Sequence, residues 1–137
     1  MGFSILQWNA NSLVAHVHEL KHYLDSIPSL PDIICVQETF LKPTLDINIL
    51  GYTVIRQDGK NGRGGVATFI RNGTIYSDVQ LFENIEGVSV LVESLSGPIR
   101  IFNFYISPSS FFDESFFSHI FEQDQIIVCG DFNAKST

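Results

Sequence analysis

Short apolar runs, each closed by a polar residue, recur along the chain and predict strands that are buried on both faces. The first run, Phe3–Gln7, leads into Asn9, and the second, Asp32–Gln37, stops at Glu38. The segment between them has the length and spacing of a helix, so the order is strand, helix, strand. In such a crossover unit the two strands lie parallel, with their carboxyl ends together. The sequence therefore predicts that Asn9 and Glu38 are neighbours in space.

The segment between these strands predicts the most regular helix of the chain, from Leu13 to about Ser26. Ser12 is suited to cap its N-terminus. The apolar residues recur at steps of four and three, as on one buried face: Leu13, Val17, Leu20, Leu24 and Ile27. His18 and His22 share a face of this helix, but no third ligand is close to them in the sequence. We interpret them as solvent-facing polar residues rather than a metal site.

The middle of the chain predicts strands joined by tight turns. Tyr52–Gln57 alternates between apolar and polar residues, as a half-exposed strand does. Val66–Arg71 and Thr74–Leu81 flank Asn72-Gly73, the dipeptide that best suits a type I′ turn. We therefore expect these two strands to be antiparallel neighbours.

A second hairpin is predicted around Gly97-Pro98. Its strands are Val88–Ser94 and Ile99–Tyr105, so Tyr105 lies at a strand end. Taken singly, Tyr105 fits an ordinary rim tyrosine with its hydroxyl in solvent. The glycine-rich segment before these strands, Asp58–Gly65, fits either a mobile loop or a close approach of backbone to a ligand or sheet.

The last predicted strand, Ile126–Gly130, is followed at once by Asp131 and Asn133. Residues two apart in an extended chain point to the same side, so these two side chains would face one cleft. A turn is the alternative for these residues taken alone. The matching polar residues at the other strand ends favour a site. Before this strand, Phe111–Glu122 has apolar residues on one helical face and predicts a covering helix.

Composition narrows the class of protein. The 137 residues are 45% hydrophobic, which predicts a single folded domain over residues 1–137. No apolar run approaches the roughly 18 residues that cross a bilayer, so we expect an intracellular protein without membrane association. Cys35 and Cys129 lie inside apolar runs and are expected to be buried, reduced thiols. The formal charge of -7 has the wrong sign for binding nucleic acid, so a phosphate-bearing substrate would need cations or a basic partner.

The polar residues at the predicted strand ends suit metal-assisted hydrolysis of a phosphodiester. Mg²⁺ takes one or two carboxylates and completes its shell with water and phosphate oxygens, so Glu38 supported by Asn9 is a suitable ligand set. Asp131 is placed to orient or deprotonate an attacking water. Asn133 and Tyr105 are placed to donate hydrogen bonds to the developing charge.

Five segments, in order, resemble motifs of the endonuclease/exonuclease/phosphatase superfamily: Gln7–Leu13, Asp32–Thr39, Gly62–Arg71, Asn103–Pro108 and Gly130–Ser136. More narrowly, they resemble the apurinic-like endonuclease domain at the N-terminus of jockey-like non-LTR retrotransposon polyproteins. The resemblance implies a four-layer α/β sandwich of two packed mixed β-sheets flanked by helices. It also implies DNA as the substrate, nicking of one strand as the reaction, a longer polyprotein with reverse transcriptase, and a nuclear location.

The same resemblance assigns roles to the candidate residues. Asn9 and Glu38 would bind the divalent metal, Mg²⁺ or Mn²⁺, and Tyr105 would contact the scissile phosphate. Asp131 would position or activate the nucleophile, and Asn133 would stabilise the transition state.

The sequence departs from the family pattern after Asn133. Family members continue through further strands to a Ser-Asp-His motif whose aspartate and histidine complete the active site, whereas the last histidine here is His119. The chain thus resembles the N-terminal part of the domain, with the C-terminal half missing. We expect an exposed apolar patch where that half would pack, and little or no turnover, because catalytic groups work as a unit.

Two other functions remain open. One is a phosphatase or phospholipase of the same superfamily, although the motifs resemble the retrotransposon branch more closely and no apolar membrane-binding loop is evident. The other is non-enzymatic: a decayed retrotransposon remnant that folds poorly or survives only as a binding module.

Overall fold

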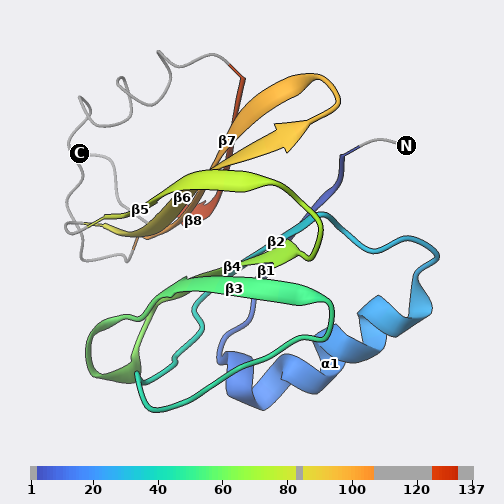
Figure 1. The fold of residues 1–137 in the computed structure, drawn as a ribbon. Helices are drawn as coiled ribbons and strands as arrows, with labels where there is room; N and C mark the ends of the chain where they lie inside the picture. The colour runs from blue at the N-terminus through green and yellow to red at the C-terminus, as the bar shows by residue number, and fades with distance from the viewer. Residues whose placement is uncertain (1–2, 83–84, 107–124, 133–137) are drawn as a thin grey trace.

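The computed structural model describes residues 3–82, 85–106 and 125–132, with residues 131 and 132 described by their backbone only. The predicted helix at Phe111–Glu122 and the predicted site residue Asn133 lie outside these residues. Within them, two four-stranded sheets pack face to face, and one helix covers the outer face of the first sheet (Figure 1). This arrangement confirms the predicted α/β fold with two packed mixed sheets.

Each sheet is mixed, with one parallel pair among the described strands. The first sheet has the order β1-β2-β4-β3, and its members are β1 (Ile5–Asn9), β2 (Ile33–Gln37), β4 (Val66–Arg71) and β3 (Tyr52–Gln57). The second sheet has the order β5-β6-β7-β8, and its members are β5 (Tyr76–Leu81), β6 (Glu86–Ser94), β7 (Gly97–Ile106) and β8 (Ile126–Phe132). A short 3₁₀ helix, η1 (Lys60–Gly62), lies between β3 and β4.

Helix α1 (Leu13–Ser26) connects β1 to β2 as a crossover, so the two strands are parallel as predicted. The predicted cap is also present, because Ser12 Oγ accepts a hydrogen bond from the backbone N of Ala15 at 3.3 Å. Strand β1 begins and ends two residues later than predicted. Its pairing with β2 continues to Asn9, which lies opposite Gln37. Neither helix in the described part of the chain is long and apolar enough to cross a membrane.

The predicted hairpin around Asn72-Gly73 is wrong. β4 pairs with β2 and β3 in the first sheet, whereas β5 pairs with β6 in the second. The backbone N of Thr74 donates to the carbonyl O of Arg71 at 3.0 Å, and of the two central residues only Gly73 has a positive φ, +96°. A type I′ turn needs positive φ at both. The turn carries the chain from one sheet to the other, because β4 already has a partner on each edge.

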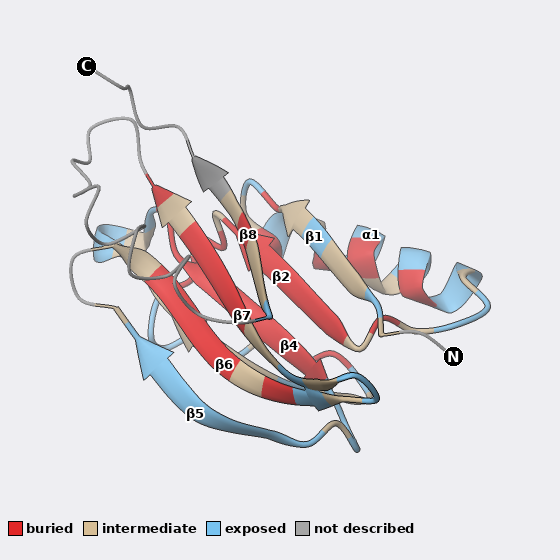
Figure 2. Ribbon diagram, turned by 90° about the horizontal axis from the view of Figure 1, so that it is seen from above, coloured by how far each residue is buried: buried red, intermediate tan, exposed pale blue. Residues whose placement is uncertain are grey.

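Buried residues pack against both faces of the first sheet. Between the sheets lie Ile33, Cys35, Ile70, Val90, Val92, Ile101 and Cys129. Under α1 the helix packs on the first sheet through Leu13, Val17, Leu20, Leu24, Ile34, Val36 and Phe69. Both cysteines are buried and form no disulfide with each other, as predicted. Edge strand β5 is exposed along its whole length, whereas β2, β4 and β7 are largely buried (Figure 2).

Candidate functional site

Asn9 and Glu38 lie in contact at the carboxyl ends of β1 and β2, as the crossover unit predicts. Asn9 Nδ2 donates a hydrogen bond to Glu38 Oε2. Asn9 Oδ1 accepts from the backbone N of Asn11 at 3.1 Å, which fixes the orientation of the amide. Both side chains are only partly buried. The amide therefore orients a carboxylate that remains accessible from solvent.

The backbone at Glu38 has an unusual conformation. Its φ is +52°, and that of Phe40 is +53°. The carbonyl O of Glu38 accepts from the backbone N of Ser12 at 3.0 Å, and the backbone N of Phe40 donates to the carbonyl O of Gly64 at 2.9 Å. Left-handed backbone at residues other than glycine costs free energy and persists only where the surroundings hold it. Backbone hydrogen bonds with Ser12 on one side and with Gly64 on the other therefore hold the strand end that carries Glu38.

A buried polar contact joins the two sheets at Gln37, the residue that precedes Glu38. Gln37 Nε2 donates to Asn103 Oδ1 at 2.8 Å, and both residues are fully buried. Asn103 Nδ2 donates in turn to the carbonyl O of Ala67 at 3.0 Å and to Thr68 Oγ1 at 3.2 Å. Residues two apart in a strand share a face, so Tyr105 of β7 is on the same sheet face as Asn103, the face toward the first sheet.

The second sheet places Tyr105 and Asp131 next to each other. Tyr105 lies opposite Asp131 in the parallel pair β7-β8, and opposite Glu86 in the antiparallel pair β6-β7. The arrowheads of β1 and β7 point to the same edge of the molecule in Figure 2. Strand β8 runs parallel to β7 and therefore in the same direction. Four predicted site residues, Asn9, Glu38, Tyr105 and Asp131, are thereby carried on strand ends of the two facing sheets.

The last strand is longer than predicted. β8 continues to Phe132, because its pairing with β7 extends to Asp131 opposite Tyr105 and to Phe132 opposite Ile106. Asp131 is therefore inside a strand, and the alternative of a turn at this residue is excluded. Asn133 follows the last described residue.

The glycine-rich segment is tied to the second sheet. Glu86 Oε2 accepts a hydrogen bond from the backbone N of Gly65 at 3.0 Å. Gln57 Oε1 accepts from the backbone N of Gly87 at 2.6 Å, and Gln57 Nε2 donates to the carbonyl O of Phe82. Burial raises the pKa of Glu86 above its ordinary value, and the hydrogen bond from Gly65 opposes that rise. These contacts favour the close approach of backbone to the sheet over a mobile loop.

Sequence reasoning missed four residues around the site: Gln37, Gln57, Glu86 and Asn103. Asn103 carried a signal, because it is a polar residue inside a mostly apolar strand, and Gln37 carried one as the polar residue that ends the apolar run of β2. Gln57 and Glu86 lie at strand ends and carried no such signal.

The accessible groups suit a hard divalent cation with few protein ligands. No cluster of three or more histidine, cysteine, aspartate or glutamate side chains occurs in the described residues. His18 and His22 are exposed, as predicted. Mg²⁺ commonly takes one carboxylate and fills its shell with water and phosphate oxygens, so Glu38 oriented by Asn9 fits that cation.

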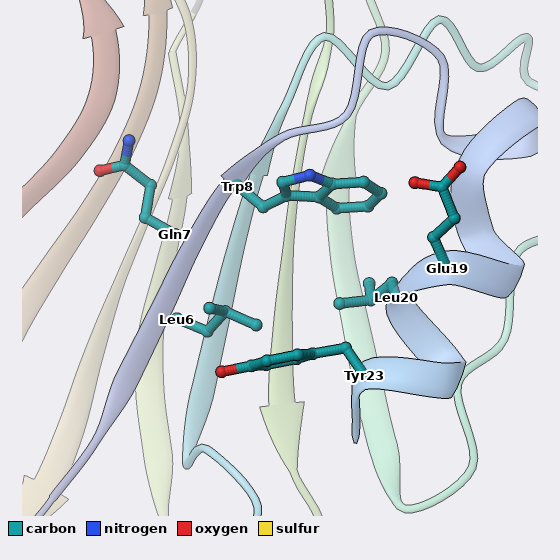
Figure 3. Close-up of a pocket in the computed structure, with 6 residues that line it drawn as sticks. All are labelled: Leu6, Gln7, Trp8, Glu19, Leu20 and Tyr23. Carbon is teal, nitrogen blue, oxygen red and sulfur yellow. The ribbon is translucent and has the colours of Figure 1, made fainter. Parts of the chain in front are cut away.

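A separate hollow of about 300 Å³ lies between β1 and α1, lined by Leu6, Gln7, Trp8, Glu19, Leu20 and Tyr23. Figure 3 shows the ring of Trp8 pointing from β1 toward the helix and the ring of Tyr23 extending from the helix toward Leu6, while Gln7 points away from them. The lining is mainly apolar. The hollow is therefore a gap in the packing of α1 on an edge strand, distinct from the polar strand ends.

The fold is shared with several DNA-processing proteins. A 3′ phosphatase from Neisseria bound to product DNA hairpin is similar over 96% of this chain and 58% of its own, with 18% identity and a TM-score of 0.70. An AP endonuclease from Archaeoglobus fulgidus is similar over 95% of this chain and 57% of its own, with 21% identity and a TM-score of 0.69. At these identities the likeness shows the fold.

A third structure belongs to a retrotransposon. The endonuclease domain of TRAS1, a telomere-specific non-LTR retrotransposon, is similar over 98% of this chain and 61% of its own, with 19% identity and a TM-score of 0.62. The chain thus spans about three fifths of the length of these structures. No curated protein sequence matches it significantly. The sequence does match the Endonuclease/Exonuclease/phosphatase family over residues 6–137. The chain therefore belongs to the endonuclease/exonuclease/phosphatase family.

Proposed function

We propose that this chain carries part of a divalent-metal-dependent phosphodiesterase site that nicks DNA. The observation that carries the proposal is the contact between Asn9 and Glu38 at the ends of β1 and β2. The buried contact between Gln37 and Asn103 supports it, because it ties this pair to the strand that carries Tyr105. Family membership supports phosphodiester or phosphomonoester bonds as the target class.

Each candidate residue has a role in this proposal. Glu38 holds Mg²⁺ or Mn²⁺, and the hydrogen bond from Asn9 orients its carboxylate. When bound, such a cation polarises the phosphoryl group and stabilises the leaving oxygen. Tyr105 contacts the phosphate, Asp131 orients or deprotonates the attacking water, and Asn133 donates a hydrogen bond to the developing charge.

The DNA substrate and the retrotransposon setting belong to the same proposal. The segments Gln7–Leu13 and Gly130–Ser136 resemble the retrotransposon branch, and the TRAS1 endonuclease domain has the same fold. The formal charge of -7 disfavours binding DNA by electrostatics alone. A basic region of a reverse transcriptase polyprotein would offset that charge, and nicking of chromosomal DNA would take place in the nucleus.

We further propose that the 137 residues alone turn over little or no substrate. The family motif with a catalytic aspartate and histidine has no counterpart in them, since the last histidine is His119. Catalytic groups that act as a unit lose most of their effect when one is absent.

The metal site is tested without activity by adding Mn²⁺ to the ¹⁵N-labelled chain and recording amide NMR spectra. Paramagnetic broadening is expected first at the amides around Asn9 and Glu38, and it should disappear in Glu38→Gln. Glu93→Gln is the matched control, because Glu93 is an exposed carboxylate at the far end of β6. Broadening centred away from Asn9 and Glu38 would contradict the proposed site.

Activity is tested by nicking of supercoiled plasmid in Mg²⁺, with EDTA, Glu38→Ala and Asp131→Asn as comparisons. We expect trace nicking at most. Strong nicking that disappears in EDTA and in both variants would refute the proposed inactivity and support the site. Nicking that persists in them would count against the site itself.

A further inference from the structure

We infer that Glu86, on the second sheet, is a positioning residue that sets the geometry of Glu38, on the first, through the loop Gly64-Gly65. The inference rests on the proposed function, because the property that Glu86 would control is the metal affinity of the site at Glu38. Glu86 itself is separated from that position by the loop and is not a ligand in this scheme.

The backbone conformation of Glu38 needs support from its neighbours. Its φ of +52° lies in the left-handed region. Just after it, the backbone N of Thr39 donates to the carbonyl O of Gly65 at 3.3 Å, and that of Phe40 donates to the carbonyl O of Gly64 at 2.9 Å. The two glycine carbonyls therefore hold the segment that follows Glu38 in its costly conformation.

The loop Gly64-Gly65 packs closely between two side chains. Gly64 and Gly65 have φ of +65° and +87°. A Cβ atom on Gly64 would lie 2.6 Å from Glu86 Oε1, and one on Gly65 would lie 2.6 Å from Thr39 Oγ1. No real side chain fits at either distance. The backbone of the loop therefore packs directly against the Glu86 carboxylate on one side and against Thr39 on the other.

Glu86 lies on the second sheet, at the start of a strand. It begins β6 and lies opposite Tyr105, so it belongs to the sheet that carries the proposed phosphate contact. Its Oε2 accepts the hydrogen bond from Gly65 N at 3.0 Å. A carboxylate in a partly buried place loses hydration, so its position there requires a compensating contact. Glu86, the loop and Glu38 therefore form a continuous chain of contacts from one sheet to the other.

Two conservative substitutions of Glu86 separate the effect of its side-chain length from the effect of its charge. Glu86→Asp keeps the charge but withdraws the carboxylate by one methylene, so the contact with Gly65 N is lost. Glu86→Gln loses the charge but keeps an oxygen acceptor at the same reach. The matched controls are Glu93→Asp and Glu93→Gln in the same strand, and Glu38→Gln reports on the metal site itself.

The measurement is the Mn²⁺ dissociation constant of the 137-residue chain and each variant by titration calorimetry, with amide NMR spectra of the metal-free proteins. Loss of a residue that orients a ligand commonly weakens metal binding 10–100-fold, and we expect about tenfold for Glu86→Asp. Glu86→Gln should stay within about threefold, and the Glu93 variants should not change. Without metal, the amide signals of Thr39, Phe40 and Gly65 should move in Glu86→Asp and much less in Glu86→Gln.

The outcomes distinguish the inference from the proposed function. If Glu38→Gln abolishes binding while Glu86→Asp binds as the unmodified chain does, Glu86 is not a positioning residue. If Glu86→Gln weakens binding as much as Glu86→Asp, an oxygen acceptor at the right distance from Gly65 N is not sufficient, and the inference is overturned. If Glu38→Gln leaves binding unchanged, the proposed metal site is wrong, and the metal-free spectra still decide whether Glu86 holds the loop.

Discussion

Gln37 Nε2 donates a hydrogen bond to Asn103 Oδ1 at 2.8 Å across the interior between the two sheets. Both side chains are fully buried between the two sheets, where most of the other buried residues are aliphatic residues and cysteines. A buried amide pair is specific in a way that apolar packing is not, because only one alignment of the sheets satisfies it. This contact therefore aligns the strand end at Glu38 with the strand that carries Tyr105.

The buried amide of Asn103 is expected to contribute strongly to stability. Asn103→Ala removes its bonds to Gln37, Ala67 and Thr68. The buried amide of Gln37, whose Oε1 already has no partner among the described residues, then loses its hydrogen bond to Asn103. We expect a loss of about 3 kcal/mol in the free energy of unfolding, measured by urea denaturation. Asn72→Ala, in an exposed turn, should change it by about 0.5 kcal/mol or less. Equal effects of the two substitutions would show that the buried network is not important for stability.

Gly87 is expected to tolerate no side chain while Phe104 is present. A Cβ atom at Gly87 would lie 2.6 Å from Phe104 Cε1, well inside van der Waals contact. Gly87→Ala should therefore lower the unfolding free energy by about 1–3 kcal/mol. In the double variant with Phe104→Ala, the combined cost should be smaller than the sum of the single costs, because the clash is gone. Additive costs in this cycle would be inconsistent with the clash.

The pH dependence of stability should report on Glu86. Burial raises the pKa of Glu86 in the folded state. The stability that Glu86 contributes is therefore fully present below its pKa in the unfolded chain, and it is lost as the pH rises through its pKa in the folded chain. Ionised Glu86 is thus unfavourable at neutral pH. The stability gain of Glu86→Gln over the unmodified chain should be larger at pH 7 than at pH 4, by urea midpoints. A gain that is larger at pH 4 would contradict the sign.

Metal binding should stabilise the fold by mass action. A ligand that binds only the folded chain, at one hundred times its dissociation constant, adds about 2.7 kcal/mol. Mg²⁺ should therefore raise the thermal midpoint, and EDTA should reverse the rise. In Glu38→Gln the midpoint should be the same with and without Mg²⁺. A rise that survives in that variant would place the cation elsewhere.

Ser12 is expected to show a conflict between its cap and its backbone. Ser12→Ala removes the hydrogen bond to Ala15 N and should cost about 1 kcal/mol of stability. Ser12 has a φ of +90°, which glycine adopts without strain. Ser12→Gly should therefore cost less than Ser12→Ala in thermal unfolding. The reverse order would mean that the positive φ of Ser12 carries no strain for glycine to relieve.

The sequence by itself determined the features that depend on neighbouring residues. The helix Leu13–Ser26 follows from local periodicity and a capping serine, and it matches the structure at both ends. The proximity of Asn9 and Glu38 follows from one short crossover, whose handedness and direction are general rules. The strands of the β6-β7 hairpin were also predicted, because their turn joins partners adjacent in the chain.

Only the tertiary structure decided the contacts made across long separations. Asn72-Gly73 has the local chemistry of a hairpin, yet it crosses between sheets because β4 is already paired on both edges. Gln37 and Asn103 are 66 residues apart, and Gly65 and Glu86 are 21 apart. Local propensity acts over a few residues and carries no information about such partners. Their pairing is selected by the joint packing of the two sheets, which brings together polar groups that are far apart in the sequence.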